Sequence, residues 1–321
     1  MKAVPPIPVA VVGAGAFGRQ HARVYRSLEN ARLVAVVDQD GNRARQVASE
    51  FGCEAFTNSE ALAGRVVAAS LAVPTQHHAT VGVPLLEGGI DLLVEKPIAA
   101  NVESGRKLVN VAQRTERILQ VGHLERFNPI VEEVYTAAHL PLFFEIHRLS
   151  QFSPRSLDVD VVLDLMIHDL DIVRTLVESE VDQVYASGLS VVSSRTDIAN
   201  ARIQFKNGCV ANLTASRVST EKIRKLRFFQ PRQYVSIDYI ERKGVCIGLD
   251  ESNRLRFVKL QPDDGEPLRR QLNAFLDCVQ NRSIPRVSGP DGLRALELAI
   301  RIREAIEEHS RLVARTVAAS K

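Results

Sequence analysis

Three ionisable side chains share one predicted helix. Asp164, His168 and Asp171 lie in a largely apolar run at residues 161–173. Spacings of four and three residues place these side chains on one helix face. A carboxylate one turn from an imidazole can orient the ring and raise its basicity, which suits a general base near neutral pH. The same pattern also fits a helix with ordinary polar residues and a structurally satisfied histidine, so both interpretations stay open on this run alone.

A lysine follows a short apolar run elsewhere in the chain. Glu95, Lys96 and Pro97 come directly after residues 92–94, which predict a buried strand. Ligands of open α/β sheets bind beyond the carboxyl ends of strands, so we expect Lys96 to point toward a ligand. Its ammonium could hold a substrate oxygen and stabilise developing alkoxide charge, while Pro97 rigidifies the turn. A solvated loop lysine is the alternative.

A glycine-rich turn marks a dinucleotide site. The motif Gly13-Ala14-Gly15-Ala16-Phe17-Gly18 follows the first predicted strand and opens the first predicted helix, which is the context that GxGxxG requires. Gly13 would make the tight turn, Gly15 would admit the pyrophosphate, and Gly18 would allow close helix packing. We therefore assign residues 13 and 15–18 to cofactor binding.

An aspartate selects the kind of cofactor. Asp38 ends the second predicted strand about 20 residues past the motif, where a carboxylate accepts hydrogen bonds from the ribose hydroxyls of NAD. It would repel the 2′-phosphate of NADP. The expected cofactor is NAD, and the nearby Arg43 leaves dual use open.

Two kinds of strand pattern divide the chain. Apolar runs at residues 9–12, 33–37, 66–73, 92–94 and 118–121 alternate with helical patterns, which predicts a doubly wound parallel sheet. After residue 121, a helix at 129–138 and a strand at 143–149 precede a helical run at 161–177. Strand patterns then predict a large, mostly antiparallel sheet, with hairpin turns at Lys206-Asn207-Gly208 and Arg242-Lys243-Gly244, because Asn and Gly tolerate the positive φ of a tight reversal. Two helices follow at 267–280 and 292–309. The predicted fold class is α/β with a Rossmann domain at residues 1–122 and a second α/β domain at 123–321.

The composition excludes several other classes. The 321 residues include 45% hydrophobic and 25% charged residues, a globular balance, and the net charge is +3 with both signs interspersed. That pattern gives no footprint for nucleic acid, and no apolar stretch is long enough to span a membrane. The four cysteines form no CxxC pair and are expected to be reduced core thiols, with no metal site. Since no signal peptide is recognisable, we expect a cytoplasmic protein.

Together these motifs make the chain resemble the Gfo/Idh/MocA oxidoreductases, most of which act on sugars, inositols and nucleotide sugars. The resemblance runs almost end to end, through GAGAFGRQHAR at 13–23, VVDQDGNRA at 36–44, VPTQHH at 73–78, VEKPIA at 94–99, VGHLERFNP at 121–129 and DLMIHDLD at 164–171. It implies a Rossmann domain plus an open-sheet domain.

The resemblance also implies roles for individual residues. Lys96, Asp164 and His168 match the family's catalytic lysine, aspartate and histidine. Glu95 and the 74–78 loop, with Pro74, Thr75 and His78, would line the cofactor. One departure is that many members carry three glycines before the aspartate, whereas this chain has Val161-Val162-Leu163. The bulkier residues could reshape a sugar pocket.

Within the family, residues 122–129 and 147–172 look most like dehydrogenases that act on the 3-hydroxyl of UDP-N-acetylglucosamine in lipid A precursor synthesis. A nucleotide-sugar pyrophosphate needs cationic donors, and Arg126, Arg148 and Arg155 lie in the stretch that leads to the predicted catalytic helix. Arg126, Arg155 and Asn128 are therefore assigned to the substrate site with the three catalytic residues. A solvated surface is the alternative for the arginines.

Two rival functions remain. An inositol or aldose dehydrogenase of the same family would not need the arginines. A non-catalytic NAD-binding sensor would keep the Rossmann site but would not need Lys96, Asp164 and His168. The hairpins of the second sheet could pair across subunits, so we expect a homodimer or homotetramer.

Overall fold

The computed structural model describes residues 5–152 and 159–319, without the side chains of 316–319. The chain forms two compact units, one made of Met1–Phe127 with Glu266–Leu296 and the other of Asn128–Gly265 with Glu297–Lys321. The segment Glu266–Leu296 therefore lies with the N-terminal residues. A domain boundary after residue 122 stays a prediction.

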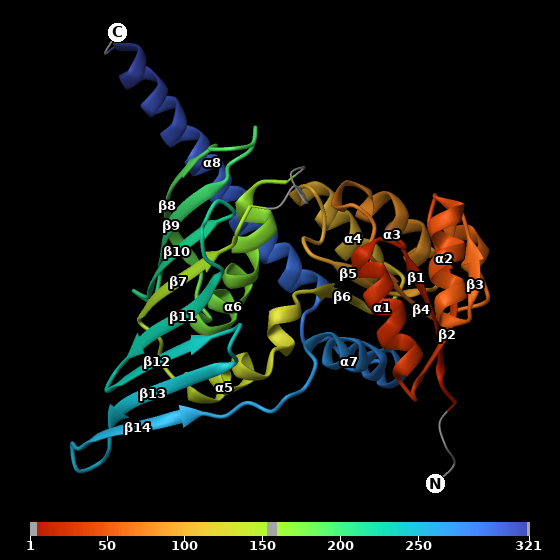
Figure 1. Ribbon diagram of the computed structural model, residues 1–321, viewed down its shortest axis with the longest axis horizontal. Coiled ribbons are helices and arrows are strands. Elements are labelled where there is room, and N and C mark those ends of the chain that lie inside the picture. Colours follow the sequence, from red (N-terminus) through yellow and green to blue (C-terminus); the bar gives the residue numbers. More distant parts are fainter. Residues whose placement is uncertain (1–4, 153–158, 320–321) are drawn as a thin grey trace. The chain divides into compact units, whose positions relative to one another are not determined.

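The first unit holds a parallel sheet of six strands in the order β3-β2-β1-β4-β5-β6, which confirms the predicted doubly wound class (Figure 1). Its strands are β1 (Ile7–Val12), β2 (Ala31–Val37), β3 (Glu54–Phe56), β4 (Ala68–Leu71), β5 (Asp91–Glu95) and β6 (Leu119–Gly122). Its helices are α1 (Ala16–Ser27), α2 (Gly41–Phe51), η1 (Ser59–Leu62), η2 (Thr75–His77), α3 (His78–Glu87), α4 (Val102–Arg114), η3 (Leu124–Phe127) and α7 (Pro267–Asn281).

Helix α7 completes the core of this unit although it comes late in the chain. Leu272 and Phe275 are fully buried in the same apolar cluster as Val9, Val11 and Tyr25. The Tyr25 hydroxyl lies 2.8 Å from Ser70 Oγ on β4, so its one polar atom is satisfied. Burial of α7 against α1 fixes the helix that begins at the glycine motif.

The second unit holds a sheet of eight strands in the order β14-β13-β12-β11-β7-β10-β9-β8. All neighbours are antiparallel except β7 and β10, which run parallel. The strands are β7 (Phe143–Leu149), β8 (Val181–Leu189), β9 (Ile198–Phe205), β10 (Val210–Ser216), β11 (Ile223–Gln230), β12 (Gln233–Asp238), β13 (Lys243–Leu249) and β14 (Leu255–Leu260). The helices are α5 (Pro129–Ala137), the π-helix η4 (Val162–Met166), α6 (Ile167–Val177) and α8 (Gly289–Ala319), which begins in the first unit.

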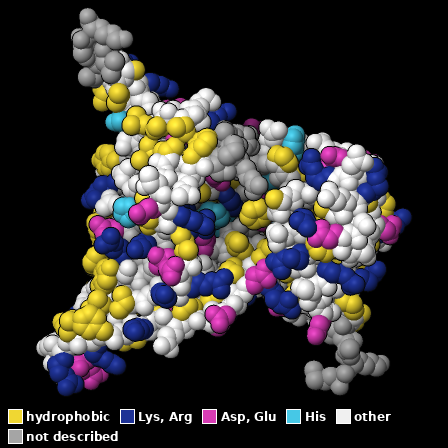
Figure 2. Space-filling view, in the orientation of Figure 1, with side chains coloured by type: hydrophobic (Ala, Val, Ile, Leu, Met, Phe, Trp, Pro, Cys, Tyr) yellow, Lys and Arg dark blue, Asp and Glu magenta, His cyan; other side chains and the backbone are white. Residues whose placement is uncertain are grey.

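Within this unit, α5, α6 and the later part of α8 lie on one face of the large sheet (Figure 1). Phe144, Ile203 and Phe228 point to that face and are fully buried. No described helix covers the other face, where Phe229 and Phe257 stay exposed. Figure 2 shows apolar side chains at the β13–β14 end of the sheet.

Two predicted hairpin turns form in different ways. Gly208 takes a φ of +87° between β9 and β10, which suits a glycine. Before β13, by contrast, Arg242 takes a φ of +48° while Gly244 lies within the strand. Our assignment of that positive φ to the glycine was wrong. None of the described helices is long and apolar enough to cross a membrane.

The alternation along β9 predicts unequal costs for two neighbouring substitutions. Ile203 is fully buried and Gln204 is exposed on the opposite face. Ile203→Ala should lower the free energy of unfolding by about 2–5 kcal/mol, whereas Gln204→Ala should change it by less than about 0.5 kcal/mol. Urea denaturation followed by circular dichroism measures both. Equal losses would contradict the burial pattern.

Candidate active site

The glycine motif forms the turn between β1 and α1. Gly13 takes a φ of +100° and donates its N–H to the Val37 carbonyl at 2.7 Å. A Cβ at Gly18 would fall far inside contact distance of the Gly13 carbonyl oxygen, so α1 can pack this closely only with glycine there. At Gly15, by contrast, a Cβ would meet no protein atom within 4 Å. The protein itself does not need glycine at position 15, which fits a backbone surface kept open for a ligand.

Asp38 lies beside this turn at the end of β2. Its Oδ2 accepts the Ala14 N–H at 2.8 Å, and its Oδ1 accepts the Asp40 N–H at 2.9 Å. Arg43 lies at the edge of the site, with Nη1 3.5 Å from Asp38 Oδ2. A carboxylate offers about four acceptor positions, so Asp38 keeps capacity for hydroxyl donors of a ribose.

Asp40 holds the start of α2 next to this site. Its Oδ1 accepts the N–H groups of Asn42 and Arg43, and these bonds hold the pKa of its carboxyl below the usual range. Phe17, which follows the open turn on α1, is 54% exposed. The residues present at the carboxyl ends of β1 and β2 therefore fit a dinucleotide.

Glu95 is tied to the first helix by a residue that the sequence did not single out. His21, fully buried on α1, places Nε2 3.1 Å from Glu95 Oε1. Gly122 makes room for this carboxylate, because a Cβ there would lie 2.7 Å from Glu95 Oε1. The only sequence signal for His21 is its place in the glycine motif's helix, three residues after Gly18.

Lys96 follows Glu95 at the end of β5 and is half-buried. Its backbone N–H donates to Glu95 Oε2 at 3.4 Å. Both residues therefore lie at the carboxyl edge of the parallel sheet, where ligands of such sheets bind.

His78 joins two loops at that edge. Its Nδ1 lies 3.0 Å from the Pro97 carbonyl oxygen, and its Nε2 lies 3.0 Å from the Val73 carbonyl oxygen. Burial lowers the pKa of this imidazole, despite hydrogen bonds that raise it. Both ring nitrogens of His78 are thus engaged by main-chain carbonyls. The ring thereby holds the loop that contains Pro74 and Thr75.

The predicted catalytic run is not one regular helix. Asp164 lies in the π-helix η4, and His168 lies in the first turn of α6. Both side chains are half-buried, whereas Asp171 is buried. Single π-helical turns within α-helices are frequent at functional sites. Val161, Val162 and Leu163, which precede Asp164, are buried rather than exposed.

Arg148 is not a solvated surface arginine. Its guanidinium is buried and makes a two-pronged pair with Asp169, with Nε 2.7 Å from Oδ2 and Nη2 2.8 Å from Oδ1. It also lies over the Tyr239 ring, 5.2 Å from the centroid. Arg148 therefore holds the residue that follows His168.

The other predicted substrate residues have mixed surroundings. Arg126 is buried on η3. Burial raises the pKa of the Asp291 carboxyl, but hydrogen bonds from Ser288 and the charge of Arg126 outweigh burial, so that the pKa is lowered. Asn128 caps α5, with its Oδ1 accepting the Ile130 N–H at 3.3 Å. Arg155 lies outside the described residues. The structure places Arg126 and Asn128 in different units, and their role in substrate binding stays a prediction.

The first unit is thus a Rossmann-type dinucleotide-binding fold with a lysine and glutamate at its carboxyl edge. Sequence profiles of two domain families match the chain. Residues 7–123 match the oxidoreductase family with an NAD-binding Rossmann fold, and residues 139–232 match the GFO/IDH/MocA C-terminal domain.

Known proteins agree with these matches. The chain is 35% identical to UDP-N-acetylglucosamine 3-dehydrogenase of Acidithiobacillus ferrooxidans, over 92% of this chain and 96% of that protein. A solved structure of that enzyme covers 95% of this chain and 99% of its own, with a TM-score of 0.90 and 33% identity. The scyllo-inositol 2-dehydrogenase (NAD(+)) of Bacillus subtilis is 27% identical over 91% of each chain. The chain therefore belongs to the Gfo/Idh/MocA family of nicotinamide-dependent oxidoreductases.

Substitutions of the two glycines are expected to affect different properties, ligand binding at Gly15 and stability at Gly18. Gly15→Ser should leave stability nearly unchanged, since serine is a good N-cap and its Cβ meets no protein atom, but should weaken binding of NADH. Gly18→Ser should cost about 1–3 kcal/mol of stability because α1 must move away from β1. Thermal unfolding and NADH fluorescence titration measure the two effects. Unchanged NADH affinity in Gly15→Ser would contradict the assignment of this turn.

Proposed function

We propose that this protein oxidises the 3-hydroxyl of UDP-N-acetylglucosamine, or reduces the corresponding ketone, with NAD as the cofactor. The observation that carries the proposal is the end-to-end similarity to the A. ferrooxidans enzyme, at 35% identity over 92% of the chain. Lys96, Asp164 and His168 match the catalytic lysine, aspartate and histidine that the family resemblance implies. A non-catalytic sensor would have no use for the three together.

The chain's own residues supply proton transfer and charge stabilisation. His168 removes the proton of the reacting hydroxyl, and Asp164 orients the imidazole for that role. The Lys96 ammonium holds the oxygen and stabilises its developing negative charge as the C=O bond forms. A bound nicotinamide would supply the acceptor for the hydride that leaves the carbon carrying this oxygen.

Gly13, Gly15 and Gly18 would hold the pyrophosphate at the start of α1, with Ala16 and Phe17 beside it. Asp38 would bind the adenosine ribose and favour NAD over NADP, because a carboxylate repels a 2′-phosphate. Its hydrogen bond from Ala14 places that charge beside the turn. Glu95, held by His21, would line the nicotinamide end.

Inositol or aldose oxidation is the second candidate, since relatives include inositol dehydrogenases such as that of Bacillus subtilis. A panel assay separates the two. Purified protein with NAD should form NADH, read at 340 nm, with UDP-N-acetylglucosamine when an aminotransferase and glutamate remove the ketone. If only inositol or free sugars were turned over, the proposed substrate would be wrong and the proposed reaction class would stand.

Alanine variants test the assigned roles. Lys96→Ala and His168→Ala should each lower kcat by about 10²–10⁴-fold, because each removes a group that acts in the transition state. NADH affinity and thermal unfolding of both variants serve as controls for cofactor binding and folding. Folded variants with near-normal kcat would show that the assignment is wrong.

We further propose that the protein is a cytoplasmic homo-oligomer. The open sheet face carries a row of side chains on adjacent strands, in register with one another and largely apolar: Phe143, Phe229, Tyr234, Ile247 and Phe257. Phe257 is 66% exposed, and a second copy of this face would cover the row. The four cysteines are free thiols, as in a reducing compartment. Light scattering should give a dimer or tetramer mass; a monomer at working concentration would contradict the assembly.

A further inference from the structure

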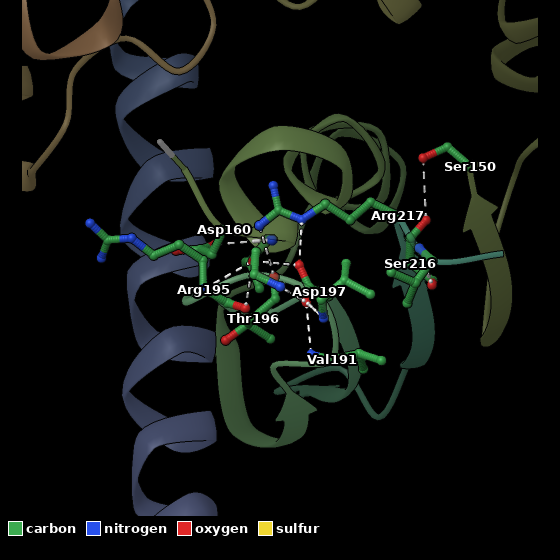
Figure 3. A network of polar contacts seen from close by, with 12 residues as sticks. Ser150, Asp160, Val191, Arg195, Thr196, Asp197, Ser216 and Arg217 are labelled. Carbon is green, nitrogen blue, oxygen red and sulfur yellow. Dashed lines mark hydrogen bonds and ion pairs between the residues drawn. The ribbon is translucent and has the colours of Figure 1, made fainter. Parts of the chain in front are cut away.

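A buried carboxylate organises the loop between β8 and β9. Asp197 is fully buried and accepts hydrogen bonds from the backbone N–H groups of Val191, Val192 and Ser193 at 2.7, 2.7 and 2.9 Å. The Ser193 hydroxyl donates to its other oxygen at 2.6 Å, and Arg217 Nε lies 3.0 Å from that oxygen. Figure 3 shows Asp197 between Arg217 and Val191. One side chain therefore fixes the whole loop.

This carboxylate is ionised in the folded protein. Burial by itself raises its pKa, but the hydrogen bonds from Ser193, Val192 and Val191 outweigh burial and hold the pKa well below its usual range. A lowered folded-state pKa means that the contribution to stability is present at neutral pH and is lost only as pH falls through that lowered value. The network is therefore intact at any pH at which a histidine base works.

The loop is joined directly to the segment that carries Asp164. The Thr196 carbonyl accepts the Val161 N–H at 3.0 Å and Arg217 Nη2 at 3.2 Å. Arg217 also donates its backbone N–H to the Asp197 carbonyl at 2.9 Å. Val161 is the residue immediately before η4. The position of this first turn thus depends on the loop that Asp197 fixes.

A second carboxylate caps the same turn. Asp160 Oδ1 accepts the N–H groups of Val162 and Leu163 at 3.0 and 3.1 Å, and its carbonyl accepts the Asp164 N–H at 3.0 Å. Arg303 on α8 holds the other carboxylate oxygen, with Nε 2.7 Å from Oδ2. Every backbone N–H from Val161 to Asp164 is therefore bonded to Asp160 or Thr196.

From this geometry we infer that Asp197, Arg217 and Asp160 form a positioning network that sets the placement of Asp164 and His168 for proton transfer. The inference rests on the catalytic roles proposed above for these two residues. A π-helical turn is rare, and this one is bonded at its start to groups outside the helix. Buried ion pairs are also a poor means of stabilising a fold, because well-packed apolar residues do as well, so their presence at this turn fits a need for placement.

Asp197→Asn tests the network, with Asp250→Asn as a matched control. Asp250 also caps a hairpin loop, accepting the N–H groups of Ser252 and Arg254 and pairing with the Arg254 guanidinium, but it lies between β13 and β14, at the opposite end of the sheet order from β8. Arg303→Gln is a milder second variant, because it removes the partner of Asp160 from a partly exposed position.

Three measurements are made on the full-length protein. We expect kcat, on whichever substrate of the panel the unaltered enzyme uses best, to fall roughly ten- to hundredfold in Asp197→Asn, with KM changed by less than about twofold. Amide hydrogen exchange of residues 161–170 should become faster. The ring resonances of ¹³C-labelled His168, assigned with His168→Gln, should titrate at a different pH. Arg303→Gln should show smaller shifts in the same directions, and Asp250→Asn none.

Unchanged exchange and an unchanged His168 titration in folded Asp197→Asn would overturn the positioning network. A fall in kcat of the same size in Asp250→Asn would also overturn it, since a general loss of stability would then explain the effect. The exchange and titration experiments need no substrate. If no panel compound is turned over, the proposed function fails while these two readouts still decide the inference.

Discussion

The close approach of α1 to β1 is the constraint on which the first unit depends. The Gly13 carbonyl occupies the space that a side chain at residue 18 would need, so the helix starts directly at the end of the strand. Its N-terminal N–H groups then point past Gly15, where the protein leaves space. Helix α1 also carries His21, which contacts Glu95, and it packs against α7. The glycine turn, the Glu95 carboxylate and the core of this unit therefore all depend on the position of α1.

The second unit places its chemistry differently. Its catalytic candidates lie on a helix whose first turn is irregular, and charged side chains within the unit hold that turn on both sides. The Asp160 side chain and the Thr196 backbone carbonyl hold its start, and the pair of Arg148 with Asp169 holds the residue after His168. Burying such an ion pair costs desolvation energy, so the pair adds little to the stability of the fold. It does restrict the orientation of both side chains, because a guanidinium and a carboxylate pair in few geometries.

Much of the fold follows from the sequence, since strand and helix periods are local signals. Strand β7 begins and ends where the sequence pattern predicts, and the parallel class of the first sheet follows from the strand–helix alternation. Strand β3 was missed because three residues at a sheet edge give no periodic signal. The return of α7 to the first unit was also missed, because a helix's apolar stripe does not say which sheet it will cover.

The sequence predicted those parts of the candidate site in which a motif determines the backbone conformation. It was a poorer guide to side chains whose position depends on an ion-pair partner distant in the sequence. Gly13 and Gly18 take the backbone geometry expected of them, and Asp38 lies beside their turn and accepts the Ala14 N–H. Arg148, considered as a cationic donor for a pyrophosphate, is buried and pairs with Asp169, and no local pattern reveals a partner 21 residues away. The π-helical turn at Asp164 was likewise invisible, because its apolar spacing is compatible with a regular α-helix.

The most direct test of the central claim follows the hydrogen itself. UDP-N-acetylglucosamine labelled with deuterium at C3 of the sugar would be incubated with the enzyme and NAD, and the NADH analysed by mass spectrometry and proton NMR. Oxidation at C3 predicts one deuterium at C4 of the nicotinamide, and unlabelled NADH from the sugar deuterated at C4. Unlabelled NADH from the C3-labelled sugar would place the oxidation at another carbon and rule out the 3-hydroxyl as the reacting group.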